Sequence, residues 1–225
     1  MARKGLVVVL GAVVAALVVA PIAIARAGEG DRAGKAGPVV ASAGAGGLRA
    51  DRIDMTGATP ATAPGDAELA LAPTTVPGLY YCRRYHIWSY VAGRYIAEEQ
   101  GYTGAEQNML RARTVAGQLG AWEEFDLCSN DDGHTVYLTA ASGYLVTAEY
   151  GYTGANWGML RGRGEWVDVW ETFDVWSDNG RYYLRNVGEG TYFTCRVDYT
   201  GPSYQMMKGT GAAPGSWEAL RFDAV

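Results

Sequence analysis

From Tyr80 to Val225 the chain alternates short apolar-rich runs with turn residues, and it shows no helical periodicity. The runs are rich in Val, Tyr, Phe and Thr, which suit the pleated surface of a sheet. Turn sequences such as Asn130–Gly133 and Ser177–Gly180 separate them, as in β-hairpins. The pattern therefore predicts an all-β domain built from many short strands.

A threefold internal repeat organises this part of the chain. Three segments align without gaps, each beginning with Gly and ending in Tyr-Thr-Gly: Gly93–Gly104, Gly143–Gly154 and Gly190–Gly201. A Met-Leu-Arg or Met-Met-Lys run follows in each, and a Trp-Glu pair with a nearby Phe closes each. These positions are Met109–Arg111, Met159–Arg161 and Met206–Lys208, then Trp122, Trp170 and Trp217, then Phe125, Phe173 and Phe222.

Three near-equal units of about four strands predict a closed barrel with threefold symmetry, a β-trefoil. The units, called one, two and three below, span about residues 79–127, 128–175 and 176–225, or about 49 residues each. A four-bladed propeller would require another repeat, and a solenoid would require distinct capping units. Equivalent positions should meet inside the barrel: Ile96, Val146 and Phe193, then Leu110, Leu160 and Met207, with the three closing Phe residues and the three closing Trp residues in or beside the same core.

The N-terminal third differs sharply in composition, because its first 79 residues contain no Trp, Tyr or Phe. A basic start, an apolar run and the small-x-small sequence Ala25–Ala27 predict a secretory signal peptide over residues 1–27, with an uncleaved membrane anchor as the alternative. Residues 28–78 are rich in Ala, Gly, Pro and Thr and predict a disordered linker. We therefore expect a secreted domain that begins at Leu79 and folds without the preceding residues.

Charge excludes several classes of partner. The chain holds 24 Asp and Glu against 19 Lys and Arg, for a formal net charge of -5, and it has no basic stretch. Nucleic acids and anionic membranes are bound through clustered Lys and Arg, so neither is an expected partner.

Catalytic and metal-binding signatures are also missing from the sequence. No nucleophile elbow, His-Glu-x-x-His motif, phosphate-binding loop or dinucleotide fingerprint is present. His86 and His134 have no ligand partners at zinc spacing, so we expect neither a metal nor a cofactor. The paired carboxylates Glu98–Glu99 and Glu123–Glu124 are adjacent strand residues that point to opposite faces, and we expect solvated surface rather than an active site. The sequence thus predicts a protein that is not an enzyme.

Over Leu79–Val225 the repeated Gly-x-Tyr/Leu-hydrophobic strand and the Trp-Glu-x-Phe closing strand resemble the fascin-like, actin-cross-linking family of β-trefoils. In eukaryotic fascins several tandem trefoils bundle actin, so the resemblance implies binding or cross-linking of a protein filament as one function. A single trefoil behind a secretory leader resembles instead the ancillary sugar- or surface-binding modules of extracellular proteins. The Gln-x-Trp motif of ricin-type lectins does not occur.

The variable residues after each Tyr-Thr-Gly turn are the candidate binding site, since loops on a rigid scaffold carry binding. Units two and three place an aromatic ring beside a polar side chain there, a pairing that suits a sugar ring and its hydroxyls. The candidate residues are Asn156 and Trp157, Ser203 and Tyr204, and the turn residues Tyr152 and Tyr199. Unit one has Glu106 and Gln107 instead and is expected to be silent. The leading hypothesis is therefore a secreted, non-catalytic module that binds extracellular polysaccharide or cell-surface glycan.

Two further patterns concern charge and redox state. Glu99 and Glu149 align with each other, as do Arg111 and Arg161, which predicts a carboxylate–guanidinium pair in two units, chiefly structural. The three cysteines leave at least one unpaired in an oxidising compartment. Cys82 and Cys128 occupy equivalent first strands, so a disulfide between them is one alternative; two buried free thiols are the favoured one.

Overall fold

The computed structural model describes residues 48–62, 79–129 and 133–225. The predicted signal peptide, most of the predicted linker and the first three residues of the Asn130–Gly133 turn lie outside these ranges. The described ranges contain fourteen strands: β1 (Arg49–Ala50), β2 (Thr59–Thr62), β3 (Leu79–Ser89), β4 (Arg94–Glu99), β5 (Met109–Thr114), β6 (Glu124–Ser129), β7 (Thr135–Thr139), β8 (Leu145–Glu149), β9 (Met159–Gly164), β10 (Phe173–Asp178), β11 (Arg181–Asn186), β12 (Tyr192–Arg196), β13 (Met206–Gly211) and β14 (Leu220–Ala224). No helix in the described part of the chain is long and apolar enough to cross a membrane.

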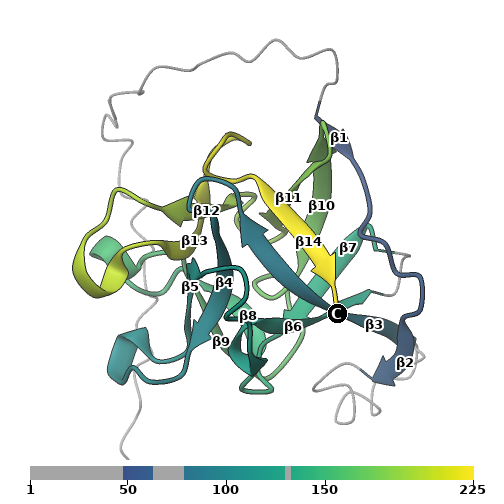
Figure 1. Ribbon diagram of the computed structural model, residues 1–225, viewed down its shortest axis with the longest axis horizontal. Helices are drawn as coiled ribbons and strands as arrows, with labels where there is room; N and C mark the ends of the chain where they lie inside the picture. Colours follow the sequence, from purple (N-terminus) through teal and green to yellow (C-terminus); the bar gives the residue numbers. More distant parts are fainter. Residues whose placement is uncertain (1–47, 63–78, 130–132) are drawn as a thin grey trace, which may run out of the picture. The chain divides into compact units, whose positions relative to one another are not determined.

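Six strands pair into a closed antiparallel ring, in the order β3, β6, β7, β10, β11, β14 and back to β3. The hairpin between β10 and β11 turns through Asn179 and Gly180, both with positive φ, as the Ser177–Gly180 sequence predicts. Because the ring closes, the barrel leaves few free strand edges. Figure 1 shows β14 running alongside β3 in the opposite direction where the ring is completed.

Three hairpins, β4–β5, β8–β9 and β12–β13, cap one end of the barrel. Each contains a β-bulge at the equivalent position, near the start of its first strand. In unit one this bulge lies between Tyr95 and Ile96. The second strands β5, β9 and β13 pair with one another, so the cap is cyclic. A six-strand barrel capped by three hairpins is the β-trefoil that the sequence predicts, and β3–β14 are its twelve strands.

The core contains the side chains that the repeat placed there. The six predicted positions are all at most 1% exposed and belong to one buried cluster: Ile96, Val146, Phe193, Leu110, Leu160 and Met207. Phe125 and Phe173 are fully buried in the same cluster, and Phe222 packs against it while partly exposed. The Phe173 and Phe193 rings meet edge to face, 4.7 Å between centroids.

The Trp-Glu pairs have the opposite arrangement from the one expected. Trp122 is 39% exposed, and Trp170 and Trp217 are only half-buried, so none of the three is a core residue. Their neighbours Glu123, Glu171 and Glu218 are buried instead. Each glutamate accepts a hydrogen bond from a threonine hydroxyl: Thr114 at 2.7 Å, Thr147 at 2.7 Å and Thr194 at 2.9 Å. The closing glutamates therefore hold the strands together, and the tryptophans face outward.

The expected surface carboxylates Glu98 and Glu99 are also buried, with 0% and 4% exposure. Glu98 accepts hydrogen bonds from the Ser142 N–H and hydroxyl at 2.7 and 2.6 Å and from the Gln100 amide at 3.0 Å. Units two and three have Ala148 and Cys195 at the position of Glu98. The polar contact is therefore particular to unit one and could not be predicted from the repeat. Three donors satisfy the Glu98 carboxylate, which explains how it tolerates burial.

The segment expected to be linker contributes to the fold. β1 pairs with β10 and β2 pairs with β3 (Figure 1). Between them Ile53 is 1% exposed and joins the main core cluster, with its N–H donating to the Gly133 carbonyl at 3.0 Å. A Cβ at Gly133 would collide with the Ile53 backbone. The Tyr85 hydroxyl donates to the carbonyl of Asp54. The folded part thus begins before Leu79, and we call residues 48–62 the N-terminal strap.

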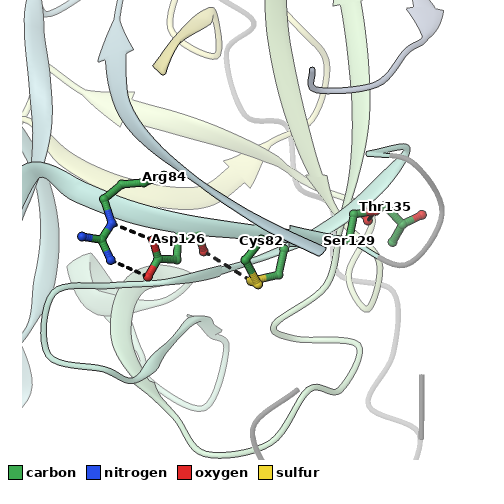
Figure 2. Close-up of a disulfide and its surroundings, with 6 residues drawn as sticks. Cys82, Arg84, Asp126, Ser129 and Thr135 are labelled. Atoms are coloured by element: carbon green, nitrogen blue, oxygen red, sulfur yellow. Dashed lines mark hydrogen bonds and ion pairs between the residues drawn. A yellow bond between two sulfur atoms is a disulfide. The ribbon is translucent and has the colours of Figure 1, made fainter. Parts of the chain in front are cut away.

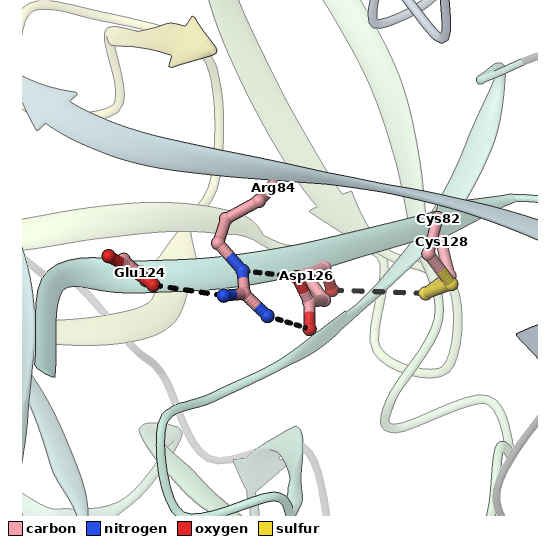
Figure 3. A network of polar contacts seen from close by, with 5 residues as sticks. All are labelled: Cys82, Arg84, Glu124, Asp126 and Cys128. Carbon is pink, nitrogen blue, oxygen red and sulfur yellow. Dashed lines mark hydrogen bonds and ion pairs between the residues drawn. A yellow bond between two sulfur atoms is a disulfide. The ribbon is translucent and has the colours of Figure 1, made fainter. Parts of the chain in front are cut away.

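Cys82 and Cys128 form a disulfide, which corrects the expectation of two free thiols. They face each other on paired strands β3 and β6, with Cα atoms 4.0 Å apart (Figure 2). On the same strand pair Arg84 binds Asp126 with two hydrogen bonds, at 2.7 and 2.9 Å, and reaches Glu124 at 3.1 Å (Figure 3). The third cysteine, Cys195, is free and buried, and burial raises the pKa of its thiol to about 11.

We expect Ile53→Ala to lower the free energy of unfolding by about 2 to 5 kcal/mol, the usual cost of truncating a buried Ile. Urea denaturation of the purified protein measures this change. Leu48→Ala, at a 40% exposed position in the same strap, is the matched control and should change stability by less than about 0.5 kcal/mol. Equal stability of wild type and Ile53→Ala would show that the strap is not part of the core.

The disulfide predicts a specific thiol count. Alkylation in denaturant should modify one cysteine without reductant and all three after reduction. Because the bridge joins residues 46 apart, replacing both cysteines by serine should cost about 4 kcal/mol in the chain-entropy account. Three reactive thiols in the unreduced protein would contradict the assignment.

Candidate functional site

The Tyr-Thr-Gly turns shape three equivalent loops on the cap. Each Gly begins a short 3₁₀ turn with positive φ, +66° at Gly104, +63° at Gly154 and +62° at Gly201. Only glycine adopts this conformation without cost, which explains why the sequence repeats it. The turn-shaping role expected for Tyr-Thr-Gly is therefore what the backbone shows.

One cation from each unit fixes both its own tyrosine and the loop of a neighbouring unit. Arg161 donates to the Tyr152 hydroxyl at 2.9 Å and to the Gln107 carbonyl of unit one at 2.8 Å. Arg111 makes the same two bonds to Tyr102 and to the Tyr204 carbonyl, at 2.8 and 2.9 Å. Lys208 does so with Tyr199 and the Ala155 carbonyl, at 3.2 and 2.7 Å. The loops are thereby held in a closed cycle.

This cycle assigns a scaffold role to two candidate residues, Tyr152 and Tyr199. Both are half-buried, and their hydroxyls are engaged by Arg161 and Lys208. The Tyr152 ring also packs against the buried trio Met109, Met159 and Met206. Tyr152 and Tyr199 therefore support the loops through these contacts.

The other candidates lie at the loop ends. Trp157 and Tyr204 are 36% and 43% exposed, at the equivalent position directly after the 3₁₀ turn. Asn156 and Ser203 precede them and are half-buried. The structure thus presents two exposed rings, one in unit two and one in unit three, each with a polar neighbour.

Around Trp157 the aromatic surface is larger than the sequence indicated. Its ring meets Tyr150 edge to face at 5.5 Å, and Tyr150 contacts Trp170 at 5.3 Å. The Tyr150 hydroxyl hydrogen-bonds Thr191 and the Gly209 carbonyl, so the middle ring is fixed. Trp170 packs over Gly188, where a Cβ would collide with its ring. Three aromatic residues therefore form a continuous row, Trp157–Tyr150–Trp170, which we call the aromatic row.

The aromatic row ends at an open cleft of about 540 Å³ in unit two. Trp170 lines this cleft together with Trp166, which at 50% exposure is the most exposed tryptophan of the described residues. Polar groups complete the lining: Thr147, Glu149, Arg163, Glu165, Asp168 and Glu171. Two indole rings beside carboxylates and a guanidinium are suited to holding a polyhydroxylated ring.

Within the cleft Glu149 positions Arg163. Its carboxylate lies 3.0 Å from the Arg163 Nε, and the side chains are 11% and 53% exposed. The pair differs from the Glu149–Arg161 pair expected from the sequence, because Arg161 is occupied by the loop cycle. Burial raises the pKa of the Glu149 carboxyl, while Arg163 and Arg161 oppose this shift. Unit one shows both contacts, Glu99 to Arg113 at 3.0 Å and to Arg111 at 3.5 Å.

Sequence reasoning missed Trp166 and Arg163, because Trp166 is not repeated and Arg163 recurs in only one other unit, as Arg113. Trp166 lies in the segment between the Met-Leu-Arg strand and the Trp-Glu pair, where unit three has Ala213. An unrepeated tryptophan between Glu165 and Asp168 is the signal that could have identified this cleft.

A larger cleft, of about 730 Å³, lies beside the disulfide and is lined by Arg83, Arg84 and Asp126 among others. Its guanidinium groups are already paired, Arg83 with Asp54 at 2.9 Å and Arg84 with Asp126. No cluster of three His, Cys, Asp or Glu that could hold a metal occurs among residues 48–62, 79–129 and 133–225.

No protein-family model matches the chain, and no curated protein does either. Among solved structures it is similar to the designed threefold-symmetric protein ThreeFoil, with a TM-score of 0.51 and 16% identity over 63% of this chain and 99% of ThreeFoil. It is also similar to a mosquitocidal holotoxin, with a TM-score of 0.52 and 11% identity over 64% of this chain. A third is the GlcNAcα1-4Gal-releasing endo-β-galactosidase of Clostridium perfringens, with a TM-score of 0.50 and 9% identity over 64% of this chain.

The chain spans 17% of the holotoxin and 32% of the galactosidase. At these identities the likeness shows the fold alone. Together with the strand pairing it confirms a β-trefoil, and membership of the fascin-like family stays a prediction.

The buried glutamate at the rear of the cleft gives a testable pH dependence. Burial raises the pKa of the Glu171 carboxyl above its ordinary value of 4.5, although hydrogen bonds from Thr147 and Asp168 oppose this. The folded protein therefore binds the proton of the Glu171 carboxyl more tightly than the unfolded chain does. The protonated carboxyl stabilises the fold at low pH, and this stabilisation is lost as pH rises through the raised pKa. We expect Glu171→Gln to gain stability relative to wild type as pH rises from about 4 through the raised pKa.

Urea denaturation across this pH range measures the difference. Glu165→Gln, which removes an exposed carboxylate of the same loop, is the control and should change stability by less than about 0.5 kcal/mol. A constant difference between Glu171→Gln and wild type at all pH values would contradict a raised pKa at Glu171.

Proposed function

We propose that the protein is a secreted, non-catalytic module that binds extracellular polysaccharide or cell-surface glycan at the unit-two cleft and its aromatic row. The observation that carries the proposal is the 50% exposed ring of Trp166 in a cleft that also contains Trp170 and the Glu149-held Arg163. Sugar rings stack on aromatic faces, and their hydroxyls pair with charged and amide groups.

The rigidity of the site supports binding rather than accidental exposure. Arg163 is held by a carboxylate, Tyr150 by two hydrogen bonds, and the Ala155 carbonyl in the Trp157 loop by Lys208. A preorganised surface binds without the cost of ordering side chains. Adjoining exposed apolar groups mark interaction sites on folded domains, and Trp166 and Trp170 line the same cleft.

The proposed role is non-catalytic because the two buried or nearly buried carboxylates of the cleft, Glu149 and Glu171, are already engaged. Glu171 accepts hydrogen bonds from Thr147 at 2.7 Å and from the Asp168 N–H at 3.2 Å, and Glu149 is paired with Arg163. General acid–base catalysis requires a carboxyl that can exchange a proton with the substrate. These two groups serve the scaffold and the placement of Arg163.

We expect Trp166→Ala and Trp157→Ala each to weaken glycan binding by about tenfold, since stacking on one aromatic ring is worth roughly 1 to 3 kcal/mol. Both rings are exposed, so melting temperatures should stay within a few degrees of wild type. Retention on a panel of insoluble polysaccharides, with F-actin as the arm for the filament-binding alternative, measures the effect.

Tyr81→Ala is the matched control, because Tyr81 is 45% exposed but does not line the unit-two cleft. It should bind as wild type does. The proposal fails if Trp166→Ala retains full glycan binding, or if the wild type binds F-actin and no glycan.

A further inference from the structure

We propose that unit one carries a second glycan site, formed by the exposed face of Trp122 and by Arg113 held on Glu99, and that its ligand is a neutral polyhydroxylated sugar. This inference rests on the proposed function of unit two. It differs from the sequence expectation, under which unit one is silent because its loop lacks an aromatic residue.

Unit one reproduces the charged part of the unit-two cleft. The Glu99 side chain is 5% exposed and lies 3.0 Å from the Arg113 Nε, as Glu149 lies from the Arg163 Nε. Arg113 and Arg163 are 43% and 53% exposed, so both guanidinium groups reach the surface. In both pairs the glutamate Oε1 is buried and has no hydrogen-bond partner in the described structure, leaving ion pairing to arginine as its compensation.

That dependence fixes each arginine in place. If Arg113 moved away, the buried Glu99 carboxylate would keep only the longer contact to Arg111 at 3.5 Å, at considerable cost. A guanidinium has five N–H donors, the contact at Nε uses one of them, and the Arg113 side chain is 43% exposed. The pair is neutral overall, so it favours sugar hydroxyls over an ionic substituent.

The aromatic part of the site is also present. Trp122 is 39% exposed and precedes Glu123, which is anchored by the Thr114 hydroxyl at 2.7 Å and the Gly120 N–H at 2.8 Å. Glu171 is anchored in the same way beside Trp170, by the Thr147 hydroxyl and the Asp168 N–H. Trp122 therefore leaves the barrel at the position from which Trp170 lines the unit-two cleft.

Unit three shows what a closed equivalent looks like. Arg196 occupies the position of Glu99 and Glu149 and binds Asp198, with its Nε 2.8 Å from the carboxylate. Its guanidinium lies 4.3 Å from the Tyr199 ring centroid and 5.9 Å from that of Trp217. Thr210 stands where the other units have the exposed arginine. Arg196 thus lies beside Trp217, at the position that we assign to the ligand in units one and two.

Two sites on one rigid domain would bind a polysaccharide chain or surface with avidity. The test is isothermal titration of the purified protein with neutral hexasaccharides of β-linked glucose and of N-acetylglucosamine. We expect two sites for wild type, and in Trp122→Ala and in Trp166→Ala one of the two should be weakened about tenfold while the other is unchanged. Trp217→Ala, the equivalent tryptophan of unit three, is the matched control and should keep two.

On insoluble polysaccharide, Trp122→Ala should lower apparent affinity at least tenfold while the remaining soluble-sugar site is unchanged. Arg113→Gln should lower the apparent affinity by a similar factor. Agreement between the two variants would show that the loss does not come from a local change caused by removing the tryptophan. A single site in wild type, with Trp122→Ala and Arg113→Gln binding as wild type, overturns the second site and leaves unit two standing. Absence of binding to every glycan overturns the proposed function as well.

Discussion

The cyclic closure of the cap is the constraint on which the rest of this structure depends. Strands β5, β9 and β13 pair in a ring, and each donates a backbone hydrogen bond to a residue held at positive φ in a neighbouring unit. These bonds run from Ala112 to Gln205, from Gly162 to Asn108 and from Gly209 to Gly158, at 3.0, 3.0 and 2.7 Å. The acceptors have φ of 61°, 59° and 71°. Their unusual backbone turns each carbonyl toward the next unit.

Loop placement follows from that closure. Because each cation of the cycle bonds a loop carbonyl of another unit, no loop can shift without disturbing its neighbour. Variation is then tolerated only at side chains that point away from the cycle, such as Trp157 and Tyr204. Binding specificity can therefore differ between units that share one backbone, which is how a symmetric fold carries an asymmetric surface.

Most of the fold could be predicted from the repeat, because equivalent residues in three units must occupy equivalent places. The N-terminal strap could not, since its few large apolar residues, Leu48, Ile53 and Met55, lie among small and charged ones and only the barrel shows where Ile53 packs. The Trp-Glu motif was interpreted wrongly, because hydrophobicity alone predicts that the tryptophan is the core residue. In the structure the glutamate is buried, since a threonine hydroxyl donates a hydrogen bond to its carboxylate. The disulfide depended on the register of β3 against β6, which the sequence does not specify. Of the candidate site residues, Trp157 and Tyr204 are exposed, whereas the hydroxyls of Tyr152 and Tyr199 bond the loop cations, and binding by these residues stays a prediction. The sharing of one cleft by Trp166 and Arg163 follows only from the fold, which brings the segment before the Trp-Glu pair against β8.

The central claim is that sugars contact the tryptophans left open beside a glutamate-held arginine. Indole N–H signals in two-dimensional NMR, assigned by single substitutions, test it during titration with a neutral hexasaccharide. We expect the signals of Trp166 and Trp122 to shift with added sugar while that of Trp217 stays fixed. Shifts confined to Trp217, or none at saturating sugar, would contradict it.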